Sequence, residues 1–209
     1  MRFTAEQQRA VVEAIGRAEK GTSAEIFAVL ARASDDYRYV AGFRLLLWVL
    51  AASLLAAAYA WWRWIDIPLP VFAAAQFGAA ILAIATGWFA PGLAVRLTPR
   101  AIRYRRAHAN AARQFMAHGI SRTRGHTGVL VFVSLAERYA EIIADSAISA
   151  RLGQAFWDDV VAGLIDHASR GELAAGYVGA IERIGEMLAG EFPPESGDAN
   201  ELEDRFVIL

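Results

Sequence analysis

The chain has 209 residues, 56% of them hydrophobic, and a formal net charge of −1. A near-neutral charge argues against a dedicated nucleic-acid binder. Because the chain has no cysteine, a disulfide framework, a thiolate zinc site and a thiol nucleophile are excluded.

Residues 1–40 are expected to form the first part of a folded domain. Thr4 suits a helix N-cap, and Gln7, three residues later, would complete a capping box. Hydrophobic residues then recur at helical spacing up to Gly21, a typical helix stop. The next run, Glu25–Leu30, is short and mostly apolar, which predicts a buried strand.

Residues 43–95 hold two long apolar runs, Leu45–Trp62 and Ile67–Val95, and neither carries a formal charge. A bilayer core is crossed by roughly 20 apolar helical residues, and inside lipid a helix satisfies its own backbone. We therefore expect a two-helix transmembrane hairpin; the alternative is a buried hairpin of a soluble domain. Tryptophans favour the membrane interface, and four lie near the ends of the hairpin: Trp61, Trp62, Trp64 and Trp88.

Arginines flank this hairpin unevenly. Several precede it and five follow it, whereas the link holds Arg63 beside Asp66. The positive-inside rule then places both termini in the cytoplasm, which predicts a multi-pass protein of the inner membrane. Anionic lipid headgroups are the expected partners of the five arginines that follow the hairpin. These are Arg96, Arg100, Arg103, Arg105 and Arg106.

Residues 96–192 are expected to complete the domain. Thr98-Pro99 predicts the start of an arginine-rich helix. The continuous apolar run Gly128–Ser134 predicts a central strand covered on both faces, and Tyr139–Ala144 returns as its hairpin partner. Two more helices are predicted. The first is Gln154–Ala168, and the last runs from Gly171 to Gly190 with a buried face of Ala175, Val178, Ile181, Gly185 and Leu188.

Three acids are the candidate metal ligands. Asp145 follows the hairpin strand, where it could ligate calcium from a loop or cap the next helix. Asp166 and Glu172 flank the turn between the last two helices and could join Asp145 in one crevice. The histidines lack ligand spacing, and no acid-rich motif with a fixed spacing provides a phosphatase centre.

The chain resembles the TPM domain family over residues 3–40 and 97–192. The matching features are Glu25 leading the early strand, the Gly128-Val129-Leu130 strand and the hairpin with Arg138. The resemblance implies an α/β sandwich with a mixed sheet between helices, here made discontinuous by the inserted hairpin. It also implies a phosphatase activity, assigned to part of the family, and calcium, held by some members in an acidic crevice.

Two departures from the family pattern argue against that chemistry. Ile143–Ala147 stands where the family has a glycine-rich loop, and Glu172 stands where its last helix has an aspartate. We therefore expect no cofactor, with calcium implied by resemblance alone. Two hypotheses are carried forward: a non-catalytic interaction or assembly module with an unknown protein partner, or a metal-assisted phosphatase.

The remaining residues, 193–209, form an acidic tail with an apolar end. Phe206–Leu209 is expected to be a late strand, a docked end or part of a partner contact, because four apolar residues would not stay in water. The candidate partner-contact residues are Glu201, Leu202, Asp204 and Phe206.

Overall fold

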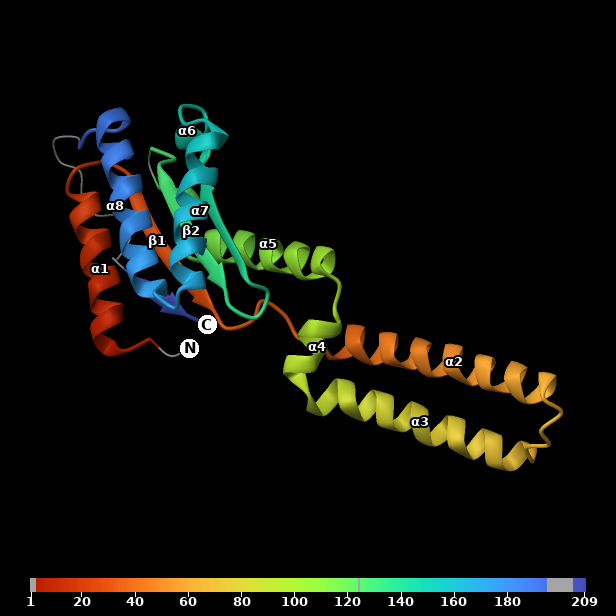
Figure 1. Ribbon diagram of the computed structural model, residues 1–209. Coiled ribbons are helices and arrows are strands. Elements are labelled where there is room, and N and C mark those ends of the chain that lie inside the picture. Colours follow the sequence, from red (N-terminus) through yellow and green to blue (C-terminus); the bar gives the residue numbers. More distant parts are fainter. Residues whose placement is uncertain (1–2, 124, 195–204) are drawn as a thin grey trace. The chain divides into compact units, whose positions relative to one another are not determined.

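The computed structural model describes residues 3–123, 125–194 and 205–209. They form two compact units, Met1–Ser34 with Arg106–Leu209, and Asp35–Arg105. The helices are α1 Ala5–Glu19, α2 Arg38–Trp62, α3 Leu69–Phe89, α4 Pro91–Leu97, α5 Arg100–Ala117, the 3-10 turn η1 Ile120–Arg122, α6 Ser146–Ser149, α7 Gln154–Ser169 and α8 Leu173–Glu191 (Figure 1). The strands are β1 Glu25–Ala31, β2 Gly128–Ser134, β3 Tyr139–Ala144 and β4 Phe206–Ile208.

The first unit is built on a four-stranded mixed sheet in the order β3-β2-β1-β4. β1 and β2 pair in parallel, with Glu25 opposite Gly128, although the whole second unit separates them in sequence. β2 and β3 form the predicted antiparallel hairpin, and its turn places Arg138 in the left-handed region at φ 52°. The β1–β2 pairing joins the two separated parts of the chain in one sheet.

Helices cover the two central strands on both faces. Ile26, Ala28 and Leu30 point toward α1, α7 and α8, where they join the larger core cluster. The alternate residues Phe27 and Val29 face Ala111 and Phe115 of α5. Every residue of β1 and β2 is buried, as their continuous apolar runs predicted, and the fold class is the predicted mixed-sheet α/β sandwich.

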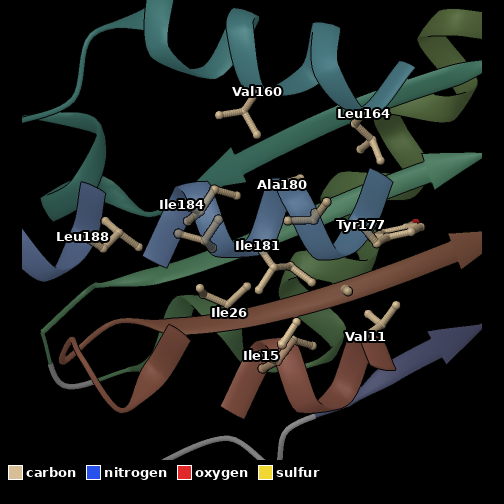
Figure 2. Close-up of a cluster of buried hydrophobic side chains, with 14 of the residues drawn as sticks. Val11, Ile15, Ile26, Val160, Leu164, Tyr177, Ala180, Ile181, Ile184 and Leu188 are labelled. Carbon is tan, nitrogen blue, oxygen red and sulfur yellow. The ribbon is translucent and has the colours of Figure 1, made fainter. Parts of the chain in front are cut away.

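α8 fills the centre of the larger cluster. Figure 2 shows its apolar face between α1 and α7 and above β1. Ile181, Gly185 and Leu188 of the predicted face are buried and Val178 is half-buried. Ala175 is exposed, whereas Tyr177, outside the predicted face, is fully buried. The helix begins at Leu173, two residues later than predicted, because Gly171 at φ 83° ends the preceding turn.

The capping box at the start of α1 is confirmed. The Gln7 N–H donates to Thr4 Oγ1 at 3.2 Å, and the Thr4 N–H donates to Gln7 Oε1 at 2.9 Å. α1 packs along α8 at a close approach, where a Cβ added at Gly185 would lie 2.6 Å from Cβ of Ala18. The exposed Arg17–Glu182 ion pair, 2.8 Å long, joins the same two helices.

The second unit contains two helices long and apolar enough to cross a membrane, α2 and α3. They are in contact where a Cβ added at Gly87 would lie 3.0 Å from Cα of Gly42. Gln76 Nε2 also donates to Ser53 Oγ at 3.3 Å between them. The predicted second apolar run, Ile67–Val95, is two helices, because proline lacks an N–H and restricts the residue before it; the break falls at Ala90, just before Pro91.

Candidate functional site

Asp145 lies between β3 and α6, and its carboxylate caps that short helix. Its Oδ1 accepts a hydrogen bond from the N–H of Ser146, the first residue of that helix, at 2.6 Å. Its Oδ2 lies 3.4 Å from Nδ1 of His126. Of the two roles considered for Asp145, the structure shows helix capping.

Asp166 and Glu172 share one arginine at the turn between α7 and α8. Nη1 of Arg170 lies 2.7 Å from Oδ2 of Asp166, and its Nε lies 3.4 Å from Oε2 of Glu172. About half of each of these side chains is exposed, so the ion pairs contribute little to stability. The two ion pairs connect the last turn of α7 with Glu172, the residue before α8.

The three candidate metal ligands are not brought into one crevice. Asp145 precedes α6, whereas Asp166 lies in the last turn of α7, at the opposite end of that 16-residue helix (Figure 1). Within the described residues, no group of three or more His, Cys, Asp and Glu side chains is arranged to hold a metal ion. Calcium takes about six to eight oxygen ligands, whereas the carboxylate of Asp145 by itself supplies at most two.

The four tryptophans expected at a membrane interface all lie on the surface of the second unit. Trp61 and Trp62 end α2, Trp64 follows in the link, and Trp88 is in the last turn of α3. The exposed fraction reaches 92% for Trp64. The guanidinium of Arg38 lies 5.4 Å from the ring centre of Trp88, which is within the range of a cation–π interaction.

The five arginines after the hairpin come from α4 and α5. Arg96 is in the last turn of α4, and the other four lie in the first two turns of α5. Arg100 donates to the Tyr104 hydroxyl at 2.6 Å, and its guanidinium lies over the Tyr104 ring. Arg96, Arg100 and Arg105 are exposed, while Arg103 and Arg106 are half-buried.

Phe206 is part of the folded domain. It belongs to β4, which pairs in parallel with β1, and its ring packs 5.0 Å from Phe3 and 5.1 Å from Tyr177. Of the alternatives for the chain end, the structure shows the late strand. The other candidate contact residues, Glu201, Leu202 and Asp204, lie outside the described residues.

Two titrating groups lie beside this strand. The Tyr177 hydroxyl donates to the backbone oxygen of Val29 at 2.7 Å, and complete burial raises its pKa well above 10.0. His118 stacks on Phe27 at 4.5 Å. Burial, and then the positive charge of Arg205, lower the pKa of His118 below its usual 6.5.

A buried polar cluster that sequence reasoning missed holds the end of the β2–β3 hairpin. Glu137, 1% exposed, accepts hydrogen bonds from the Ser34 N–H at 3.0 Å and from the Ser134 hydroxyl. Ser34 Oγ in turn donates to Ser134 Oγ at 2.9 Å. The cluster lies where the chain leaves the first unit. No local pattern predicts it, because Ser34 is 100 residues from Ser134 and 103 residues from Glu137.

A groove beside β3 was also missed by sequence reasoning. A groove of about 640 Å³ runs beside β3, between α5 on one side and α6–α7 on the other. Nδ1 of His108 lies 2.8 Å and 3.1 Å from the two carboxylate oxygens of Glu141 there, and the Tyr139 hydroxyl donates to Glu141 at 3.0 Å. The signal that could have found it is an acid within the otherwise uncharged strand Tyr139–Ala144.

The fold thus defines the class of protein. It is an α/β domain with a four-stranded mixed sheet, and two long apolar helices interrupt its sequence after the first strand. Residues 93–187 match the sequence model of the TPM domain, which confirms the resemblance over that part of the chain. No curated protein gives a match to the chain.

Among solved structures, the chain is similar to the BA42 protein from the psychrophilic bacterium Bizionia argentinensis, determined by NMR. The two share 20% sequence identity with a TM-score of 0.61, over 100% of this chain and 97% of that one. At this identity the similarity establishes the fold.

Proposed function

We propose that the protein is an integral membrane protein that presents its TPM domain at the cytoplasmic face as a non-catalytic interaction module. The observation that carries the membrane assignment is the exposed apolar surface of the second unit. Leu54 and Leu55 of α2 are each 71% exposed and Phe77 of α3 is 70% exposed, which is unfavourable in water and favourable in lipid.

The proposed orientation rests on charge. The arginines of α4 and α5 meet the cytoplasmic headgroups, and the link around Asp66 lies on the outer side. Lipids are then the first partners, and a protein is the second.

The non-catalytic role is supported by what the candidate acids do. Asp145 caps a helix, and Asp166 and Glu172 both bind Arg170. These carboxylates contact neighbouring residues of the chain. A metal-assisted phosphatase needs its carboxylates to converge on a metal ion with a bound water.

Topology can be tested with single cysteines, because the chain has none of its own. Asp66→Cys should react with a membrane-impermeant maleimide in intact cells, and Ser169→Cys, at an exposed position of the first unit, should react after permeabilisation alone. The reverse pattern would refute the orientation, and recovery of the full chain in the soluble fraction would refute the membrane assignment.

The non-catalytic role is tested with the purified full chain. With Mg²⁺, Mn²⁺ or Ca²⁺ and p-nitrophenyl phosphate, turnover should be the same for the natural chain and for Asp145→Ala. A metal-dependent phosphate release that Asp145→Ala abolishes would show that the protein is a phosphatase.

A further inference from the structure

β3 is an edge strand of the sheet. β4 covers the β1 side, and within the described residues no strand pairs with the outer side of β3. An uncovered edge presents backbone N–H and C=O groups that can accept another strand. In the sequence neither edge could be recognised, because strand order is a tertiary property.

The register tells which backbone groups face outward. In an antiparallel pair, residues alternate between bonding inward and pointing away from the partner. The Asp145 N–H bonds Gly128 O at 2.9 Å, so Ile143 and Glu141 also bond toward β2, and Ile142 points its N–H and C=O outward. The same alternation applies at Ala144, where the Ser149 hydroxyl already donates to the carbonyl at 3.0 Å.

This edge forms the floor of the 640 Å³ groove. On the α5 side the groove is lined by Phe115 and Met116, and on the other side by Leu152 and Trp157. β3 spans six residues, or about 20 Å of extended chain. An apolar channel of this kind beside an open strand is the geometry used for β-strand addition, in which backbone bonds hold a peptide and side pockets select it.

Charge indicates which peptide would fit. Among the residues that the structure describes, Glu141 is the one acid that lines the groove, and neither lysine nor arginine lines it. The carboxylate is held in place by His108 and Tyr139, and it lies on the α5 face of β3, whereas Ile142 packs with the larger core cluster on the α7 face. A strand bound antiparallel would place opposing residues on the same faces: a cation beside Glu141 and an aliphatic side chain beside Ile142.

The same charge disfavours a second copy of this chain. Antiparallel self-pairing about Ile142 would set Glu141 against an isoleucine of the other copy, and self-pairing about Glu141 would set the two carboxylates against each other, a destabilising arrangement. A cationic partner complements the negative charge of Glu141, whereas a second copy brings to it an isoleucine or another carboxylate.

We propose that the outer edge of β3 and the groove beside it bind an extended segment of a partner protein, which adds as a fifth, antiparallel strand with an aliphatic residue toward α7 and a lysine or arginine toward Glu141. This inference rests on the interaction role proposed above and names the surface and the chemistry of the partner.

The test uses the full chain in detergent and a fluorescent probe peptide, acetyl-Thr-Val-Ile-Lys-Thr-amide, whose central isoleucine would lie opposite Ile142. We expect saturable binding by fluorescence anisotropy. A peptide N-methylated at that isoleucine loses one hydrogen bond between the strands, so its affinity should fall by up to about tenfold. A peptide with glutamate in place of lysine should also bind more weakly. These controls use the natural chain, so they do not depend on the folding of any variant.

Two variants of the chain then locate the site. Glu141→Lys should reverse the preference, so that the glutamate peptide binds better than the lysine peptide. Glu186→Lys makes the same charge change on the exposed face of α8, away from the groove lining, and should leave the preference unchanged.

Three results would overturn the proposal: no saturable binding of the lysine peptide, equal binding of the N-methylated peptide, or an identical loss of preference in Glu186→Lys. A stable dimer that competes with the peptide would assign the edge to self-association and would overturn it too. Cysteine labelling and the phosphatase assay use neither peptide nor groove, so a failure here is distinguishable from a failure of the proposed function.

Discussion

The contact between α1 and α8 joins the two separated parts of the folded unit, and a single methyl group can test it. A Cβ built on Gly185 would lie 2.6 Å from Cβ and 3.0 Å from Cα of Ala18. Real side chains do not approach this closely, and the Cα of Ala18 belongs to the helix backbone, so Gly185→Ala must push the two helices apart.

The magnitude follows from two opposing terms. Alanine in place of glycine inside a helix stabilises by about 1 kcal/mol, whereas an extra methyl group in a packed interface costs about 1–3 kcal/mol. Gly179, on the exposed side of the same helix, has open space around its added Cβ, so Gly179→Ala keeps the first term and lacks the second. We expect Gly185→Ala to be less stable than Gly179→Ala by about 2 kcal/mol.

The assay is pulse proteolysis of the full chain in detergent across a urea gradient, because it reports the unfolded fraction of the water-exposed domain. Ala18→Gly removes one of the two clashing atoms, so it should reduce the cost of Gly185→Ala and leave the effect of Gly179→Ala unchanged. If Gly185→Ala stabilised the domain as much as Gly179→Ala does, α1 would not pack on α8 as described, and the reasoning would be refuted.

Two further predictions concern the groups beside β4. Tyr177→Phe removes the buried bond to Val29 O and leaves a carbonyl without that donor, which should cost about 1–3 kcal/mol by the same proteolysis assay; an unchanged urea midpoint would contradict it. Because the pKa of His118 is lowered in the folded state, the unfolded chain binds more protons as pH falls below about 6.5, so stability is full above that pH and declines as pH falls through the folded pKa. His118→Gln should flatten the slope of stability between pH 7 and pH 5, and an unaltered slope would refute this assignment.

Local sequence patterns predicted most elements of this protein because the forces behind them act over a few residues. The Thr4–Gln7 capping box needs only its own helix turn. The apolar runs at β1 and β2 predicted strands buried on both faces, because a strand between two helical layers has no polar side. The length and lack of charge of the two apolar runs in residues 43–95 predicted helices in the same local way, and the break at Ala90 was missed although Pro91 stood beside it.

The site residues depended on contacts that sequence spacing does not contain. Asp145 and Asp166 looked able to share a crevice, but α7 separates them. His108 and Glu141, 33 residues apart, meet because α5 covers one face of the sheet at its β3 edge. Strand order, the docking of Phe206 on β1 and the open edge of β3 were likewise decided in the tertiary structure, because each depends on which surfaces remain uncovered after the whole chain has packed.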